Sequence, residues 1–176
     1  MERKTDEICK QVNRKLFILV LLKWFGVKVD KLIPIWKVVL RPKTEYASPL
    51  WHSGLTVSDT SKLERLQKSA LGIILGVTYI DFIKHYRVKD KVVPYDEALA
   101  LLKLPTLSTQ REALTRKFAE DTFNNERHKS FFEESNDTGH DTRIKHTIKV
   151  PFCKTDRYRN SAIPYMSRLL NEIAAR

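Results

Sequence analysis

The sequence has few cysteines and few glycines, and both shortages narrow the classes of protein it can encode. Cys9 and Cys153 are its only cysteines among 176 residues, and they are far apart. A disulfide framework or a zinc site needs more cysteines at closer spacing. The five glycines stand apart, so the chain has no glycine-rich loop to cradle a phosphate. These shortages argue against disulfide-rich secreted domains and nucleotide-binding loop enzymes, and they favour a reducing compartment, the cytoplasm or the nucleus.

Long apolar runs are also missing. The longest is Leu16–Leu22, bracketed by Lys15 and Lys23, and it is far shorter than the ~20 residues that span a bilayer. We expect it to form a buried helical segment, and we expect no membrane partner. The N-terminal residues 1–7 are mostly charged and show no secretory signal.

Positive charge, by contrast, is abundant. The chain has 32 Lys and Arg against 21 Asp and Glu, a formal net charge of +11 that is spread from Arg3 to Arg176. Hydrophobic residues make up 42% of the chain, enough for a buried core in a chain of this length. A folded surface with this charge attracts polyanions, so RNA, DNA or an RNA–DNA hybrid are the expected partners.

Apolar residues recur at spacings of three and four over most of the chain, which predicts an all-α fold. Turn and capping residues set the expected ends of the helices. The predicted helices run from Thr5 to just before Gly26, from Asp30 with Pro34 in its first turn to a kink or end at Pro42, from Asp59 to Leu75, from Pro94 to Leu102, from Thr109 to Phe123, and from Ser161 to Ala174. The faces expected in the core include Ile33, Trp36, Val39 and Leu40 in the second helix, and Ile163, Met166 and Leu170 in the last.

The composition divides the chain into four expected parts. Residues 1–78 read as a helical bundle, and residues 79–123 as a connector with a second helical unit. Residues 124–147 are polar apart from Phe131 and Phe132, too few apolar residues to order the segment, so they read as a disordered linker. Residues 148–176 read as a basic C-terminal segment that ends in a helix.

No catalytic or metal site is expected. Acidic pairs such as Asp96-Glu97 are adjacent in sequence, so on a helix the two side chains diverge by about 100°. Polymerases and nucleases need carboxylates that converge on Mg²⁺. Tyr79-Ile-Asp81-Phe82 resembles a polymerase turn but lacks the second aspartate. A metal-dependent nuclease that uses Asp96 and Glu97 remains an alternative.

Basic side chains supply the candidate binding residues. Several recur on predicted helices, where they can neutralise phosphates, although lysines and arginines on helices are often only solvated. Arg157-Tyr158-Arg159, with Tyr165, mixes cations and aromatic rings, a combination that holds single strands. The candidate nucleic-acid-binding residues are Lys37, Arg41, Lys43, Lys62, Arg65, Lys68, Arg157 and Arg159.

Four strings, in this order, resemble the C-terminal region of reverse transcriptases from non-LTR (LINE-type, jockey-like) retrotransposons. Together they span most of the chain. They are Arg41-Pro-Lys-Thr-Glu-Tyr-Ala-Ser-Pro-Leu-Trp-His52, Leu63-Glu-Arg-Leu-Gln-Lys-Ser-Ala-Leu-Gly-Ile-Ile-Leu-Gly76, Tyr95-Asp-Glu-Ala-Leu99 with Leu104-Pro-Thr-Leu-Ser-Thr-Gln-Arg-Glu-Ala-Leu114, and Asp156-Arg-Tyr-Arg-Asn-Ser-Ala-Ile-Pro-Tyr165.

The resemblance implies that residues 1–78 are similar to a polymerase thumb, which holds the template-primer duplex. The catalytic palm and its Mg²⁺ would then lie upstream of Met1, and this chain alone would bind nucleic acid without polymerising it. By position, Arg41 and the basic face of residues 62–68 would lie near the duplex backbone, while Tyr46, Trp51 and Leu66 would be thumb core.

A helical protein-interaction module is the main alternative to nucleic-acid binding. In it, Trp24, Trp36 and Trp51 would anchor an interface, and the positive charge would serve solubility. The sequence leaves open which nucleic acid is preferred and which oligomeric state the chain adopts.

Overall fold

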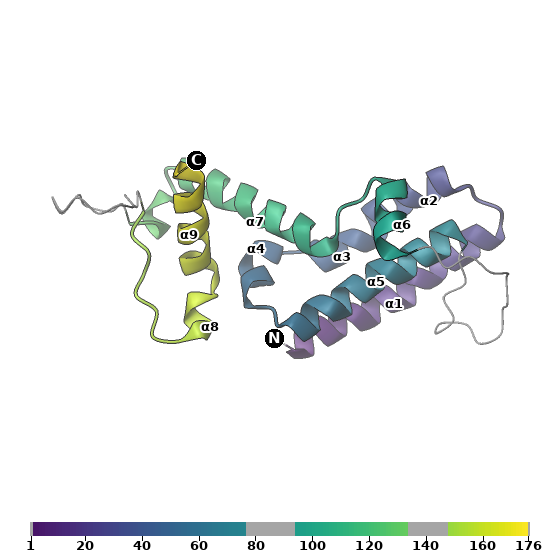
Figure 1. The fold of residues 1–176 in the computed structure, drawn as a ribbon, viewed down its shortest axis with the longest axis horizontal. Coiled ribbons are helices and arrows are strands. Elements are labelled where there is room, and N and C mark those ends of the chain that lie inside the picture. The colour runs from purple at the N-terminus through teal and green to yellow at the C-terminus, as the bar shows by residue number, and fades with distance from the viewer. Residues whose placement is uncertain (1, 77–93, 134–147, 176) are drawn as a thin grey trace. The chain divides into compact units, whose positions relative to one another are not determined.

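The fold was obtained as a computed structural model that describes residues 2–76, 94–133 and 148–175. The elements in these ranges are helices, and none is a β-strand, which confirms the all-α prediction (Figure 1). The chain divides into two compact units. Unit 1 comprises residues 1–46 and 56–110, and unit 2 comprises residues 47–55 and 111–176.

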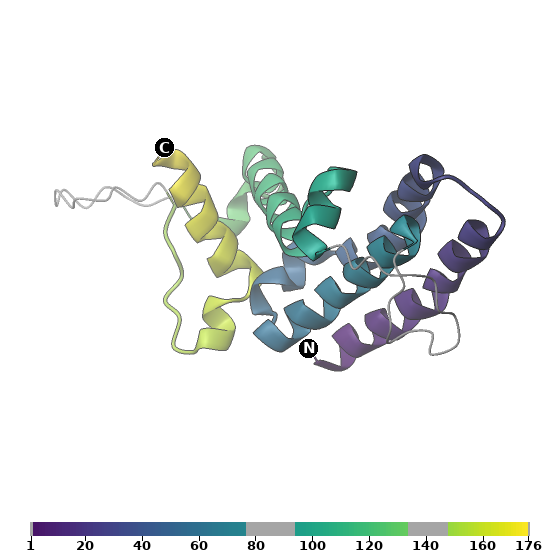
Figure 2. The same ribbon diagram turned by 45° about the vertical axis from the view of Figure 1, so that its right-hand side comes forward.

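Two long helices, α1 (Glu2–Trp24) and α5 (Val57–Leu75), form the centre of unit 1 and lie side by side in Figures 1 and 2. Near their beginnings, Lys62 Nζ lies 2.9 Å from Asp6 Oδ1. Near their ends, Lys23 Nζ donates to the carbonyl oxygen of Ile74 at 2.9 Å. The two helices therefore run in the same direction.

Local signals in the sequence explain where these two helices end. Gly26 and Gly76 follow α1 and α5 with φ of 79° and 73°, the left-handed conformation that glycine adopts without steric cost. The carbonyl of Ile74 in the last turn of α5 is satisfied by Lys23, a favourable place for a cation. The predicted end of each helix is confirmed.

The apolar run Leu16–Leu22, expected to be a buried segment, is only partly buried in α1. Leu16 and Leu19 are fully buried, but Phe17 and Ile18 are 60% and 41% exposed. The interpretation of Leu16–Leu22 as a wholly buried segment is therefore wrong. Consecutive residues on a helix point about 100° apart, so a continuous apolar run must expose some of its members when one side of the helix faces solvent.

The segment after α1 departs from its expected geometry. Pro34 lies inside α2 (Val29–Ile35), beyond its first turn, and the chain continues as a wide π-helical turn, Trp36–Leu40, into α3 (Arg41–Glu45). Pro42 therefore neither kinks nor ends a regular helix but stands in the first turn of α3, where its missing N–H costs nothing.

The core face of this segment differs from the prediction at two positions. Trp36 and Leu40 are fully buried as expected, and Leu32 joins them, whereas Ile33 is only partly buried. Val39 is 43% exposed, because the π-helical turn changes the angle between successive side chains relative to an α-helix.

Two further helices follow the residues that the structure does not describe. The predicted short helix is confirmed as α6 (Tyr95–Leu102). The next helix, α7 (Leu107–Asn124), begins two residues earlier than predicted. Its capping residue is Thr106, whose Oγ1 accepts the backbone N–H of Thr109 at 3.1 Å. The expected cap at Thr109 is therefore wrong. Thr106, three residues earlier, has the same side chain and caps the helix instead.

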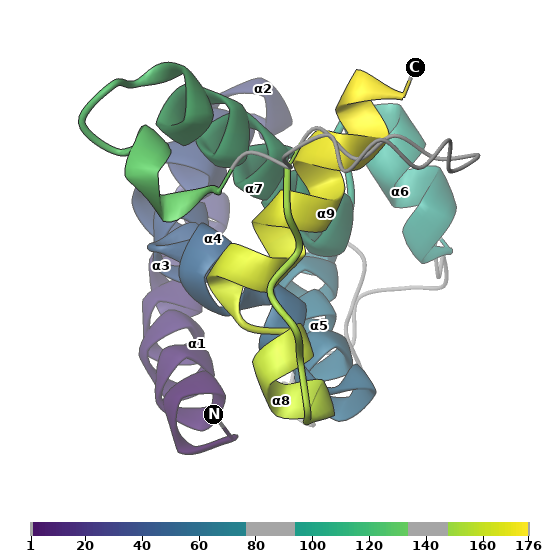
Figure 3. The same ribbon diagram turned by 90° about the vertical axis from the view of Figure 1, so that its left-hand side faces the viewer.

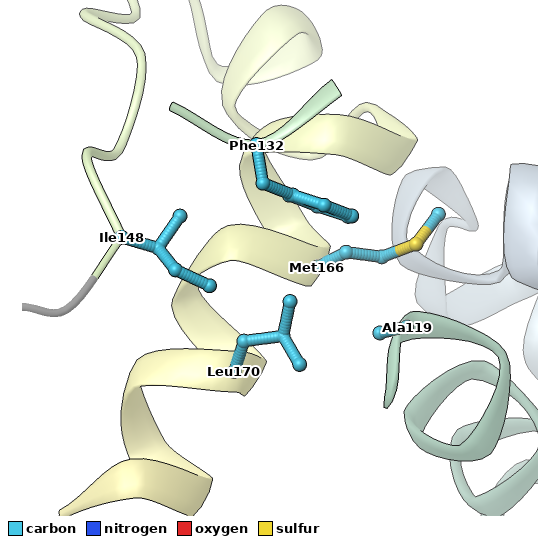
Figure 4. Close-up of a cluster of buried hydrophobic side chains, with 5 residues drawn as sticks. All are labelled: Ala119, Phe132, Ile148, Met166 and Leu170. Carbon is cyan, nitrogen blue, oxygen red and sulfur yellow. The ribbon is translucent and has the colours of Figure 1, made fainter. Parts of the chain in front are cut away.

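Unit 2 is built around the C-terminal helix α9 (Ala162–Ala174), whose bounds match the prediction. Its other elements are α4 (Ser48–Trp51), a 3-10 turn at His52–Gly54, the C-terminal part of α7, a 3-10 turn at Lys129–Phe131, and α8 (Asp156–Arg159). Figure 4 shows its apolar cluster, in which the side chains of Ala119, Phe132, Ile148, Met166 and Leu170 meet. Ile163, expected in this core, is 41% exposed, and Leu169 is buried in its place.

The structure groups the chain differently from the four expected parts. Residues 47–55 belong with the C-terminal half of the chain. Phe132, placed in the expected linker, is buried against α9 because it pairs with apolar residues distant in sequence. Residues 77–93, expected as a connector, and 134–147 of the linker lie outside the described residues.

Candidate nucleic-acid interface

Helix α5 presents two cations on its outward face. Leu63, Leu66 and Ala70 are buried on the inner face, whereas Arg65 and Lys68 are exposed. Residues three apart are neighbours on a helix surface. Within the described part of the chain, neither cation is paired with a carboxylate. No carboxylate of the described residues therefore competes with an external anion for these two charges.

Lys62, the third residue of the predicted basic face, has a different role. Its Nζ lies 2.9 Å from Asp6 Oδ1 and 3.9 Å from Asp59 Oδ1, and the side chain is only one-third exposed. It links α5 to α1 and offsets the charge of the buried Asp59. Binding a phosphate would require Lys62 to leave these two carboxylates.

Arg41 does not lie where a phosphate could reach it. Its side chain is buried, and its Nε pairs with Glu45 Oε1 one turn later. Burial of a guanidinium normally requires such a partner. The assignment of Arg41 to the duplex backbone is therefore not supported by its position, while Lys37 and Lys43 on the same segment are exposed.

Arg157 and Arg159 are exposed on α8 in unit 2. Thr155 caps this short helix through Oγ1, which accepts the N–H of Tyr158 at 3.2 Å. Tyr158 itself is 48% exposed. The side chains of Arg157, Tyr158 and Arg159 therefore lie on the surface of unit 2.

Tyr165 belongs to the interior side of the same unit. Its ring meets His52 edge to face at 6.5 Å, and the guanidinium of Arg168 lies 5.8 Å from its centre. Burial, followed by the nearby Glu112 charge, raises the pKa of Tyr165. Tyr165 is thus a packing residue, and it is not available for stacking.

Of the three residues expected in the thumb core, two are buried and one is exposed. Trp51 and Leu66 are buried, and the Trp51 ring receives the guanidinium of the buried Arg111 at 5.9 Å. Tyr46, however, is 79% exposed, so its assignment to the core is wrong. It follows the last turn of α3, where the backbone leaves the helix.

Glu64 organises a polar contact that the sequence did not reveal. Its Oε1 accepts the N–H of Ser108 at 2.7 Å, and its Oε2 accepts the Tyr95 hydroxyl at 2.7 Å and the N–H of Leu107 at 3.3 Å. Burial, followed by the hydrogen bond to Glu64, raises the pKa of Tyr95 well above its usual range. The carboxylate therefore ties α6 and the start of α7 to α5.

The exposed aromatic face of α1, which Phe25 extends just past the helix end, was only partly anticipated: Trp24 was expected in an interface, but Phe17 and Phe25 were not. Trp24 and Phe25 are 78% and 81% exposed, and Phe17 lies seven residues before Trp24, on the same side of the helix. A second apolar stripe, opposite the buried one, was the available signal in the sequence.

Within the described residues, no three acidic, histidine or cysteine side chains gather where they could hold a metal ion. Asp96 and Glu97 are exposed in the first turn of α6, a position where acidic side chains favour the helix dipole. In the same part of the chain, no helix is both long enough and apolar enough to cross a membrane.

The chain matches none of the protein-family models, none of the curated proteins and none of the solved structures with which it was compared.

Proposed function

We propose that this chain is a nucleic-acid-binding part of a reverse transcriptase of the non-LTR retrotransposon type, downstream of the polymerase palm, and not catalytic by itself. The four strings that resemble that family support the proposal, as do the helical fold and the net charge of +11. The expected partner is an RNA–DNA hybrid or another duplex held by its phosphates, and Mg²⁺ would belong to the palm of the larger enzyme.

The exposed pair Arg65 and Lys68 carries this proposal. Both cations lie on the exposed face of α5, whose opposite face is buried in the core of unit 1. Packing of that buried face holds the helix backbone, and with it the two cations, in place. Contacts of this kind read no bases but position a duplex. Each phosphate neutralised contributes about 0.9 to the slope of log affinity against log salt.

A binding measurement with matched charge variants tests the proposal. Anisotropy of a labelled RNA–DNA hybrid is followed across salt concentrations for the whole chain and for Arg65→Ala/Lys68→Ala. We expect the double variant to lower affinity and to reduce the salt slope by about 1.8, since two contacts are lost, without changing the melting temperature. Lys10→Ala/Arg14→Ala removes the same charge from exposed positions of α1 and is the control. Equal losses in both variants would show attraction by net charge alone.

The second candidate, a protein-interaction module, is favoured by the aromatic face of α1. Trp36 and Trp51 are buried and cannot anchor an interface, whereas Trp24 and Phe25 can. Self-association that is insensitive to salt and is lost in Trp24→Ser/Phe25→Ser would support this function, because apolar contacts are not screened by ions.

A further inference from the structure

The surface around α8 combines exposed aromatic rings with cations. We define the basic-aromatic surface as Phe152, Lys154, Arg157, Tyr158 and Arg159. Phe152 is 83% exposed and Tyr158 is 48% exposed, and the three cations are exposed as well. Residues 149–168 contain five Lys or Arg and a single acidic residue, Asp156.

The backbone beneath this surface is fixed by hydrogen bonds from other segments of unit 2. Ser53 Oγ donates to the carbonyl of Asn160 at 2.6 Å, and Arg168 Nη2 donates to the carbonyl of Arg159 at 2.9 Å. Figure 3 shows α8 leading directly into α9, whose inner side packs in the unit's core. The C-terminal end of α8, which carries Tyr158 and Arg159, is therefore preorganised, and this lowers the entropic cost of binding there.

Together with Phe118, these two exposed rings differ from the other aromatic rings of unit 2, each of which contacts a ring or a cation. Phe123 contacts Phe132, His128 stacks on Phe131, and Tyr165 contacts His52. Among the described residues, neither Phe152 nor Tyr158 has a ring or cation stacked on it. The exposed parts of these two rings can therefore receive a flat partner.

The chemistry of the surface selects its ligand. Arginine and lysine attract phosphates, and an open aromatic ring stacks on a nucleobase. In a duplex the bases are already stacked on each other, so only an unpaired strand offers both groups together. A membrane-surface segment presents a continuous apolar face, whereas Phe152 and Tyr158 are separated by Cys, Lys, Thr, Asp and Arg at residues 153–157.

We propose that the basic-aromatic surface binds unpaired polynucleotide, with bases stacked on Phe152 and Tyr158 and phosphates held by Arg157 and Arg159. The proposal rests on the proposed function in that the chain binds nucleic acid. It adds a second class of ligand, single-stranded RNA or DNA, on residues that are not those of α5.

The test compares a labelled 12-nucleotide single strand, as RNA and as DNA, with a labelled RNA–DNA hybrid, using the whole chain. Phe152→Leu/Tyr158→Leu keeps apolar side chains but removes both rings. We expect it to weaken single-strand binding by about tenfold per ring while hybrid binding and the melting temperature stay unchanged. Tyr158→Phe, which retains the ring, should bind as the parent does. Phe118→Leu, at another exposed ring of unit 2, is the matched control.

The outcomes separate this inference from the proposed function. Failure of the parent chain to bind either probe overturns both. Hybrid binding that depends on Arg65 and Lys68, together with single-strand binding that survives the loss of both rings, overturns this inference alone. Loss of binding to phosphatidylserine vesicles in Phe152→Leu/Tyr158→Leu, with no binding of either strand, would assign the surface to a membrane and would also overturn it.

Discussion

Replacing Glu64 by alanine tests the polar contact that joins three helices of unit 1. The Glu64 carboxylate accepts hydrogen bonds from the Tyr95 hydroxyl and from the N–H groups of Leu107 and Ser108. Those two N–H groups lie in the first turn of α7, where no intrahelical acceptor exists. Glu64→Ala therefore removes a helix cap and a charge-assisted hydrogen bond together.

The expected cost follows from these two losses. Removing a helix cap costs about 1 kcal/mol, and a hydrogen bond to a charged group contributes about 1.5–3 kcal/mol. Glu64 is partly exposed, so water replaces some of what is lost. We therefore expect the free energy of unfolding to fall by about 2–3 kcal/mol, which lowers the melting temperature by about 4–12 °C for a chain of this size.

Urea unfolding followed by circular dichroism measures this loss, and a double-mutant cycle with Tyr95→Phe isolates one hydrogen bond. We expect Tyr95→Phe to cost about 1 kcal/mol in the parent and much less in Glu64→Ala, since the bond is then already absent. Glu172→Ala, at an exposed position of α9, should change stability by less than about 0.5 kcal/mol. Equal costs of Tyr95→Phe in both backgrounds would refute the reasoning.

Three further changes probe packing, protonation and backbone conformation. Leu170→Ala empties a site in the cluster of unit 2 and should lower the free energy of unfolding by about 2–5 kcal/mol in urea; a loss below about 1 kcal/mol would show that the cluster is loosely packed. Burial, followed by the Arg111 charge, lowers the pKa of His52, against an opposing effect of Glu112. The folded chain thus favours the neutral imidazole. The contribution of His52 to stability is fully present above the unfolded pKa of about 6.5 and is lost as the pH falls below that value and through the lower folded pKa. Urea midpoints at pH 7.5 and 5 should show this loss, and a loss of the same size in His52→Gln would assign it elsewhere. Gly76→Ala forces alanine into a left-handed conformation and should lower the melting temperature, at a cost of about 1 kcal/mol; an unchanged melting temperature would contradict this.

The helices were predictable from the sequence because their signals are local. The period of apolar residues and the following glycine define α5. The period of apolar residues also predicts α6 and α9, although Lys103 and Ala175 follow these helices in place of a glycine. The burial of Phe132 was not predictable in this way, because its partners Met166 and Leu170 lie more than 30 residues away. The prediction for Pro34 was wrong in another way, because Pro34 lies inside α2 beyond its first turn and the chain continues from α2 into the π-helical turn Trp36–Leu40.

The candidate binding residues show the same limit. The spacing of Arg65 and Lys68 correctly placed them on an exposed face. It could not show that Lys62 is held by Asp6, 56 residues earlier in the chain. The spacing of four between Arg41 and Glu45 is visible in the sequence. The burial of Arg41 and the exposure of Tyr46 were not, because both depend on packing among segments that are not adjacent.

The geometry of unit 1 makes the two candidate functions separable by mutation. The helices α1 and α5 contact each other, and each has a buried stripe, which includes Leu16 in α1 and Leu66 in α5. The cations of α5 and the aromatic residues of α1 each lie opposite the buried stripe of their own helix, so the two faces share no residue. A substitution at Trp24 should therefore leave hybrid affinity unchanged, and Arg65→Ala/Lys68→Ala should leave self-association unchanged. An effect of either change on the other property would mean that one continuous surface serves both.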